Sequence, residues 1–287
     1  PNTIYLNSMW SLKYTIFPLI ITKTNNSFKI VISPRGMLKP SALAIKPFKK
    51  HLFLWVFKLF LNNKMIFFHA TDFEERKDIE NKIKKNNINV VGNVPARVEI
   101  FNIIKKEFRK INLVCISRIH PIKNISFLIK ILNEIDRSIS LKLNIYGPFE
   151  DKAYLETCKS LLRENRANVA IEFCGPIQHH LIKHIIQTNH FFILPTLGEN
   201  FGHSIFEAFA AARPVIISNT TPWQKLEEHS VGFDLSLNDM DLWVQTIEKC
   251  ALMSQKEFDE WCINAHQFAE NYLNSNNFKQ EYLQLFS

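Results

Sequence analysis

Short apolar runs alternate with amphipathic segments along most of the chain. Runs rich in β-branched and aromatic residues predict strands at 29–33, 65–68, 89–91, 112–116, 141–146, 169–173, 190–194 and 214–218. Helical periodicity covers 124–136, 152–164, 179–187 and 204–212, and the stretch from Asp239 to Ser287 is almost entirely helical in pattern. Strand–helix alternation at this spacing is typical of parallel sheets covered by helices. We therefore predict an α/β protein, with a boundary between two units near residues 94–110.

The longest apolar stretch, residues 51–68, is interrupted by Lys58, Lys64 and a pair of asparagines. A membrane-spanning helix needs about 20 largely apolar residues, so this segment does not qualify. It predicts one helix over about 41–61, followed by the strand at 65–68. Lysines flank its aromatic-rich face, a pattern typical of helices at a membrane interface; they are Lys46, Lys49, Lys50, Lys58 and Lys64. Two interpretations stay open: a core helix with a solvated basic side, or contact with an anionic membrane surface.

Composition narrows the class of protein. With 287 residues and 46% hydrophobic residues, the chain is long and apolar enough to bury a large core, which excludes a disordered chain. Its net charge of +8 suits nucleic acid, anionic lipid or phosphate-bearing small molecules. No zinc finger, arginine-rich arm or RNP-like aromatic pattern is present, so we expect no nucleic-acid partner. Five cysteines without a CxxC pair predict reduced core thiols in a cytosolic protein. No signal peptide is recognisable, and a start at Pro1 indicates a processed end or a fragment.

Candidate chemistry lies where predicted strands end, because ligands of parallel sheets bind at the carboxyl ends of the strands. The strand at 112–116 is followed by Arg118 and Lys123, two cations in a loop that enters a helix. Such cations can converge on one anion, Arg118 through its fork and Lys123 as a point charge. After 141–146, Gly147 begins a tight turn where the backbone can approach a ligand.

The loop after 190–194 is the most informative segment. Gly198 and Gly202 bracket the entry to a helix, whose N-terminus adds about half a positive charge for an anion. Glu199 and Glu207 lie eight residues apart, and a carboxylate can accept hydrogen bonds from two vicinal hydroxyls. Taken alone, these two acids also fit ordinary surface positions. Phosphate held by amides and cations, together with diols held by carboxylates, describes a sugar nucleotide.

The spacing of Glu199 and Glu207, with seven residues between them, resembles the E-x7-E motif of the retaining glycosyltransferases of family 4 (group 1). The surrounding FILPTLGENFGHSIFEAFAAARPVI resembles that family's core, and VCISRIHPIKN resembles its Arg…Lys phosphate loop. SPRGMLKPSA, FFHATDFEE, NIYGP, FCGPI and TPW also match, in the same order along nearly the whole chain. The resemblance implies a GT-B fold with two Rossmann-like domains.

The resemblance also implies a domain plan. Residues 1–105 would form the later part of the N-terminal, acceptor-side domain, which is incomplete because the family's first strands and glycine-rich loop would precede Pro1. Residues 106–266 would form the domain that binds the nucleotide sugar, and residues 267–287 would be helices that cross back. Ala212 occupies a usual glycine position, where a left-handed cap costs about 1 kcal/mol for a residue with a Cβ.

Carried over residue by residue, the motif implies roles in catalysis and donor binding. Arg118 and Lys123 would hold the diphosphate and stabilise the departing nucleoside diphosphate, Glu199 would contact the donor sugar, and Glu207 would bind the ribose diol. Further donor-binding positions are Gly147, Gly198, Asn200, Phe201, Gly202, His203 and Ser204. No metal and no cofactor are implied.

Several further positions carry two interpretations. On the acceptor side, Arg35 and Gly36 would either contact the acceptor or form an ordinary turn. His69 would either contribute to the acceptor cleft or cap the end of a strand. His120 would belong to the phosphate loop or simply to a turn. Asp239-Met240-Asp241 imitates a DxD metal motif, but it opens a helix and fits a cap. His180 and His184, one turn apart, suit a solvated helix face better than a metal site.

The expected function is transfer of a hexose from a UDP-, GDP- or ADP-linked donor to a saccharide or lipid-linked acceptor in bacterial surface polysaccharide biosynthesis. The expected location is cytoplasmic, including a peripheral position on the inner face of the cytoplasmic membrane. One alternative is an inactive sugar-nucleotide-binding or scaffold protein. The other is a basic nucleic-acid-binding protein, which a steep salt dependence of oligonucleotide binding would identify.

Overall fold

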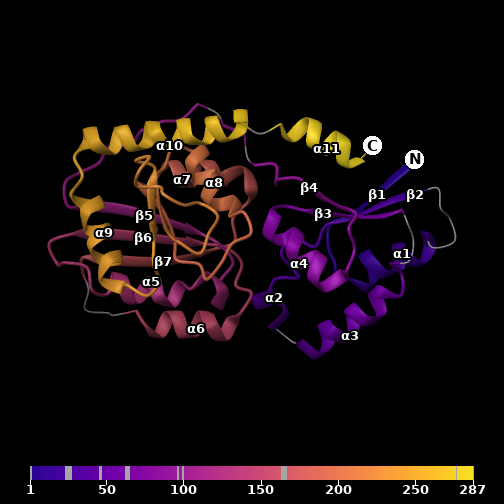
Figure 1. Cartoon of the computed structure of the whole chain (residues 1–287). Coiled ribbons are helices and arrows are strands. Elements are labelled where there is room, and N and C mark those ends of the chain that lie inside the picture. The colour runs from indigo at the N-terminus through magenta and orange to yellow at the C-terminus, as the bar shows by residue number, and fades with distance from the viewer. Residues whose placement is uncertain are drawn as a thin grey trace. The chain divides into compact units, whose positions relative to one another are not determined.

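The computed structural model describes residues 2–22, 28–44, 47–61, 65–95, 97–98, 100–162, 167–275 and 277–286. The chain divides into two compact units, each drawn with its helices and strands in Figure 1. The first unit comprises Pro1–Val94 with Asn276–Ser287, and the second unit comprises Pro95–Ser275.

The second unit is built on a six-stranded parallel sheet. In the order β10-β9-β8-β5-β6-β7, its strands are β10 (Gly232–Leu235), β9 (Val215–Ser218), β8 (Phe191–Leu194), β5 (Lys110–Ile116), β6 (Ser140–Tyr146) and β7 (Val169–Gly175). Every residue of β8 (FFIL) and β9 (VIIS) is buried. Strands covered on both faces need continuous apolar runs, which explains why these two segments show no alternation.

Helices cover both faces of this sheet. They are α5 (Ile125–Leu132), α6 (Lys152–Ser160), α7 (Ile182–Gln187), α8 (His203–Ala210), α9 (Met240–Leu252) and α10 (Gln255–Ser275), with short 3-10 turns η2 (Pro121–Lys123) and η3 (His179–Leu181). Helix α8 packs against α7 and α10 on one face, while α5 packs against α6 and α9 on the other (Figure 1). The exposed side of each helix is polar enough to face water, so this unit is a three-layer α/β sandwich.

The strand order places a switch point at the centre of the second sheet. From β5 the chain proceeds outward through β6 and β7, then returns to β8 on the opposite side of β5 and proceeds outward through β9 and β10. The loops after β5 and β8 therefore leave the sheet side by side in opposite directions. Such a crevice at the carboxyl ends of the strands is where open parallel sheets bind ligands.

The first unit has a four-stranded parallel sheet in the order β1 (Asn2–Leu6), β2 (Phe28–Ile32), β3 (Ile66–Ala70) and β4 (Ile88–Val90). Its helices are η1 (Leu12–Ile16, a π-helix), α1 (Phe17–Thr22), α2 (Pro40–Ala44), α3 (Pro47–Lys58), α4 (Phe73–Ile83) and α11 (Phe278–Phe286). One face of the sheet joins the larger core, which includes Phe57 and Phe68. On the other face, Val31 and Val91 pack with Leu285 of α11.

All eight predicted strands are confirmed, each with bounds within two residues of the prediction. Two strands were missed: β1, at the start of the chain, and β10, whose GFDL has too few apolar residues to show a pattern. The single helix expected over 41–61 is wrong, because α2 and α3 are separate helices. Pro40 and Pro47 each occupy a first helical position, where the missing N–H and fixed φ favour a new helix. Lys46 and Lys64 lie outside the described residues.

Candidate functional site

The loop after β5 brings Lys123 to the switch point. His120 caps the turn η2 through Nδ1, which accepts from the Ile122 N–H at 3.3 Å. Asn124 takes a left-handed conformation, with φ 56°, that leads the chain into α5. Lys123 Nζ then forms an ion pair with Glu199 Oε1 from the loop after β8, and the two side chains are only 12% and 13% exposed. This ion pair thus joins two segments whose residues are 76 positions apart in the sequence.

Backbone bonds hold the same two loops together. The Leu197 N–H donates to the Ile122 carbonyl at 2.8 Å, and the Thr196 hydroxyl donates to the same carbonyl at 3.1 Å. Thr196 is fully buried, and its own carbonyl accepts from Ser218 Oγ at 2.5 Å. Sequence reasoning missed Thr196, because nothing around it distinguishes a loop-tying hydroxyl from an ordinary turn residue. These bonds hold the loops after β5 and β8 together around Lys123.

Gly202 is the N-terminal cap of α8, with φ 79°. A Cβ at this position would lie 2.8 Å from Ile205 Cδ1 and 3.4 Å from Trp223 Nε1, so only glycine fits without displacement. The Trp223 indole donates to the Phe201 carbonyl at 2.6 Å, and the Phe201 ring packs among Phe206, Trp223 and Tyr272. Gly198, Asn200, His203 and Ser204 complete this loop and the first turn of α8.

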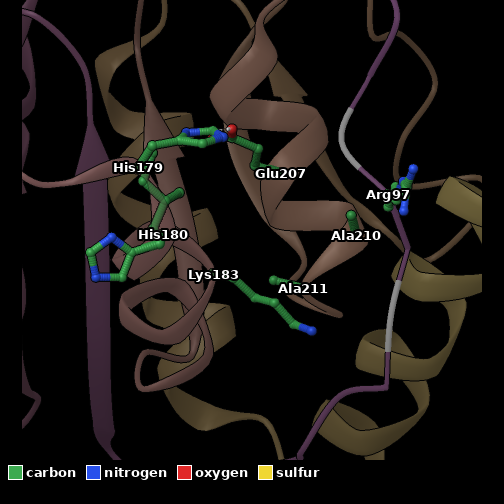
Figure 2. Close-up of a pocket in the computed structure, with 8 residues that line it drawn as sticks. Arg97, His179, His180, Lys183, Glu207, Ala210 and Ala211 are labelled. Carbon is green, nitrogen blue, oxygen red and sulfur yellow. Dashed lines mark ion pairs between the residues drawn. The ribbon is translucent and has the colours of Figure 1, made fainter.

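Glu207 projects from α8 into a cavity of about 350 Å³, lined by Arg97, His179, His180, Ile182, Lys183, Glu207, Ala210 and Ala211. Its side chain is 16% exposed, and burial raises the pKa of the carboxyl, with His179 opposing part of that rise. Figure 2 shows the His179 ring reaching toward Glu207, with Nδ1 3.9 Å from Oε1. His179 itself is 86% exposed, so solvent screens this pair.

Gly147 lets the loop after β6 pack against the loop after β5. Its φ is 145°, and a Cβ there would lie 1.8 Å from the Ser117 carbonyl oxygen, so no other residue is accommodated. The turn carries Glu150, whose Oε2 accepts from Arg118 Nη1 at 2.9 Å, with both side chains about half exposed. Glu150 was not singled out from the sequence, since its partner lies 32 residues away.

The structure therefore divides the predicted donor-site residues into three groups. Lys123 and Glu199 meet between the loops after β5 and β8, next to Gly198. Glu207 faces the cavity with His179, and Arg118 pairs with Glu150 on a more exposed rim.

In the first unit, Arg35 and His69 belong to one hydrogen-bonded chain. Arg35 donates to Asn7, Asn93 and the Tyr5 hydroxyl, the last at 3.0 Å. His69 Nε2 lies 2.8 Å from the Val91 carbonyl oxygen, which can only accept, so Nε2 carries the proton and donates it. In the neutral ring Nδ1 then has no proton, and it accepts from the Tyr5 hydroxyl at 2.7 Å.

His69 is fully buried, and burial lowers the pKa of its ring. Both ring nitrogens are occupied within the unit, which fits the strand-end interpretation of this residue. The adjacent Gly36 N–H donates to the buried carboxylate of Glu75 at 2.5 Å, a contact that sequence reasoning missed.

Several alternative interpretations are resolved. Asp239 caps α9, its Oδ1 accepting from the Leu242 N–H at 2.9 Å, so the capping interpretation is confirmed. His180 and His184 are exposed, as a solvated helix face requires. Ala212 adopts φ 57°, which confirms the left-handed cap expected there. Within the described part of the chain, no three His, Cys, Asp or Glu side chains gather as a metal site, and no helix is both long and apolar enough to cross a bilayer.

Comparison with known proteins adds independent findings. The family model described as glycosyl transferases group 1 matches residues 96–267. No curated protein matches the sequence. Among solved structures, sucrose-phosphate synthase from Thermosynechococcus elongatus is similar with a TM-score of 0.74 and 17% identity, covering 99% of this chain and 71% of that chain.

Two further structures are similar. The Anabaena protein HepE, in complex with UDP and glucose, has a TM-score of 0.73 at 16% identity, covering 99% of this chain and 76% of that chain. WaaG, a glycosyltransferase involved in lipopolysaccharide biosynthesis, has a TM-score of 0.68 at 12% identity, covering 90% of this chain and 78% of that chain. At these identities the likeness shows the fold alone, and with the two parallel sheets it confirms the predicted GT-B architecture of two Rossmann-like domains.

Proposed function

Because the chain belongs to the glycosyl transferases of group 1, we propose that it transfers a hexose with retention, as a member of family 4. The donor in this proposal is a UDP-, GDP- or ADP-linked sugar, and the acceptor is a saccharide or a lipid-linked saccharide. The proposed setting is bacterial surface polysaccharide biosynthesis. HepE was solved with UDP and glucose, and WaaG is involved in lipopolysaccharide biosynthesis, which supports these choices.

The observation that carries the proposal is the ion pair of Lys123 with Glu199 at the switch point. The pair joins a cation from the loop after β5 to a carboxylate from the loop after β8, three residues before the glycine cap of α8. In this proposal the carboxylate binds sugar hydroxyls. A nucleotide sugar presents a diphosphate next to sugar hydroxyls, so it can engage both groups of the pair at once. On diphosphate binding, Lys123 would turn to the phosphate and Glu199 to the sugar.

In the proposed mechanism, the bond between the anomeric carbon and the β-phosphate oxygen breaks, and its electron pair leaves with the nucleoside diphosphate. Lys123 and Arg118 stabilise the charge that develops on that oxygen, which is electrostatic catalysis by preorganised donors. The acceptor hydroxyl oxygen forms the new bond from the face that the phosphate vacates, and its proton passes to the leaving phosphate oxygen. This route needs no protein nucleophile and, in our proposal, no metal or cofactor.

The domain roles are also proposed. Residues 106–266 bind the donor, residues 1–105 serve the acceptor, and residues 267–287 cross back to the acceptor side. Arg35 and Gly36 are the proposed acceptor-side positions, with His69 supporting Arg35 through Tyr5 from within the unit. A cytoplasmic location is part of the same proposal.

A titration of Glu207→Gln tests the donor site. If the carboxylate accepts both ribose hydroxyls, the variant loses at least tenfold in affinity for a nucleoside diphosphate, since a hydrogen bond to a charged group contributes about 1.5–3 kcal/mol. With the 2′,3′-dideoxy analogue the loss is much smaller, because neither protein then has a diol to bind. Isothermal titration of both proteins with both ligands measures this difference.

Arg118→Ala is the matched control, since it weakens both ligands alike through the diphosphate that they share. Equal losses for Glu207→Gln with and without the diol would make Glu207 a structural acid and overturn the donor-site assignment. Binding without turnover of any nucleotide sugar, in the presence of saccharide and lipid-linked acceptors, would favour the inactive sugar-nucleotide-binding alternative.

A further inference from the structure

Helix α3 exposes a stripe of large apolar side chains. Phe48, Leu52 and Trp55 of this helix, with Leu59 in the turn directly after it, recur at intervals of four, three and four residues and are 81%, 55%, 64% and 57% exposed. The spacing of the three helical residues places them along one side of α3, while Leu54 and Phe57 are buried in the core. An ordinary surface helix shows the reverse pattern, with polar residues outward. A core helix whose outer side is solvated and basic would not expose these large apolar side chains, so that interpretation does not explain the exposed side of α3.

A second exposed apolar stripe lies on η1 and α1. Leu12, Tyr14, Phe17, Ile20 and Ile21 are between 48% and 71% exposed, although the same helices bury Ile16 and Leu19. This stripe had no counterpart in the sequence analysis, because a run such as FPLII is indistinguishable from a core helix before burial is known. Scattered exposed apolar residues are normal, but a contiguous set marks an interaction surface.

One pocket joins the two stripes. A cavity of about 480 Å³ is lined by Trp10, Leu12 and Ile16 together with five residues of α3: Lys49, Lys50, Leu52, Phe53 and Val56. Trp10 packs edge-on against Phe53 at 5.3 Å between ring centroids. Leu12 of one stripe and Leu52 of the other line the same cavity, so η1 and α3 adjoin there, and α1 continues directly from η1. The exposed side of η1, α1 and α3 is here called the apolar–basic face.

The charge of this part of the chain has a single sign. Nine lysines and one arginine precede Asp72, and no Asp or Glu does. Because the net charge of the whole chain is only +8, the residues from Asp72 onward carry a slight acidic excess. Lys13, Lys49 and Lys58 are exposed on the helices that carry the apolar stripes. Elements that carry lysines and no acid of their own, around exposed aromatic and aliphatic side chains, complement an anionic, apolar partner.

We propose that the apolar–basic face binds the surface of an anionic lipid bilayer. Phe48, Trp55 and their neighbours enter the boundary between headgroups and acyl chains, and Lys13, Lys49 and Lys58 contact lipid phosphates. The interaction holds the first unit peripherally, without a spanning helix. It is independent of sugar transfer, so it stands or falls separately from the proposed function.

Vesicle flotation tests the proposal with the full chain. The protein floats with vesicles of phosphatidylcholine mixed equally with phosphatidylglycerol, binds phosphatidylcholine alone far more weakly, and is released by salt. Each lysine near an anionic surface contributes about fivefold, so Lys13→Glu, Lys49→Glu and Lys58→Glu together lower the partition constant by at least about 100-fold. The matched control reverses Lys130, Lys152 and Lys256, three exposed lysines of the second unit, and leaves flotation unchanged.

A second pair of variants tests the apolar contribution. Phe48→Ser with Trp55→Ser lowers partitioning at least about tenfold. The control Ile100→Ser with Ile263→Ser, at exposed apolar positions of the second unit, has no effect. Tryptophan fluorescence is quenched by lipids brominated on the acyl chain, and Trp55→Phe reduces this quenching, with Trp10 in the neighbouring cavity as the remaining reporter on this face.

Equal flotation with neutral and anionic vesicles, equal losses in the control variants, or sedimentation as a dimer that buries this face would each overturn the proposal. Titration of the same variants with a nucleoside diphosphate verifies that the second unit is intact.

Discussion

Arg213 lies fully buried behind α8, and its guanidinium donates to backbone carbonyls from several segments. Nε donates to Asn189 at 2.7 Å, Nη1 to Ala212 at 2.8 Å, and Nη2 to Asn102 at 2.8 Å and to Gln187 at 2.5 Å. Gln187 ends α7 and Ala212 follows α8, so the cation lies where two helix dipoles are negative. Burial lowers the pKa of this guanidinium, but Arg remains charged in practice.

Replacing Arg213 tests how much this arrangement stabilises the second unit. Arg213→Met keeps a long side chain but leaves buried carbonyls without donors, and we expect a loss of about 3–5 kcal/mol in the free energy of unfolding. Urea denaturation measures it as a lower midpoint with an unchanged slope. Arg137→Met is the control, because Arg137 is exposed and its replacement changes stability by less than about 0.5 kcal/mol. A similar small loss for Arg213→Met would show that water replaces the guanidinium.

Among the elements, β5 and β8 are joined at their amino ends by His190. Nδ1 accepts from the Asn112 N–H at 2.8 Å and Nε2 donates to the Lys105 carbonyl at 3.0 Å, so the ring is bound in its neutral form. Burial lowers the pKa of His190 to about 4. This ring therefore helps to align the two strands whose opposite ends carry the proposed donor site.

The pH dependence of the free energy of unfolding tests whether His190 is neutral in the folded chain. Between pH 6.5 and about 4 the unfolded chain binds a proton at His190 that the folded chain does not, so folding stability falls as the pH decreases through this window. The difference amounts to roughly 3 kcal/mol at full effect. The free energy of unfolding of His190→Gln should depend less on pH in this window than that of the natural chain. His180→Gln, at an exposed position, should reproduce the natural slope; if both variants do, His190 is not the group responsible.

At the scale of the whole molecule, the proposed mechanism uses positive charge of the second unit, instead of a divalent metal, to neutralise the diphosphate. In that mechanism Arg118 and Lys123 would exchange their carboxylate partners for the diphosphate, and the N-terminus of α8 would add further positive charge. We therefore expect the affinity for a nucleoside diphosphate to change by less than about twofold in excess chelator, as measured by isothermal titration. Loss of binding in chelator that magnesium or manganese restores would contradict this expectation and require a metal at the diphosphate.

By itself the sequence determined the positions of most strands and helices and the loops that carry candidate chemistry. Apolar periodicity is a pattern over a few neighbouring residues, so it can be recognised in the sequence. The segment from Gly198 to Glu207 lies within one loop and the helix that follows, so its motif can be recognised in the sequence as well. The left-handed conformation of Ala212 was predictable because the family resemblance places this residue at a usual glycine position. Over residues 41–61 the apolar pattern did not distinguish one long helix from two shorter ones, and the prediction of one helix was wrong.

Only the tertiary structure decided which of these local features meet. Lys123 pairs with Glu199 because strand order places β8 beside β5, and no local pattern encodes that order. Likewise, His69 is buried by Tyr5 and Val91, which come from distant parts of the chain. The exposed apolar stripe of α3 could be recognised only in the structure, which shows that other residues of the helix, Leu54 and Phe57, are the ones buried in the core. Pairing and burial depend on the packing of whole elements, whereas a local pattern specifies only the element itself.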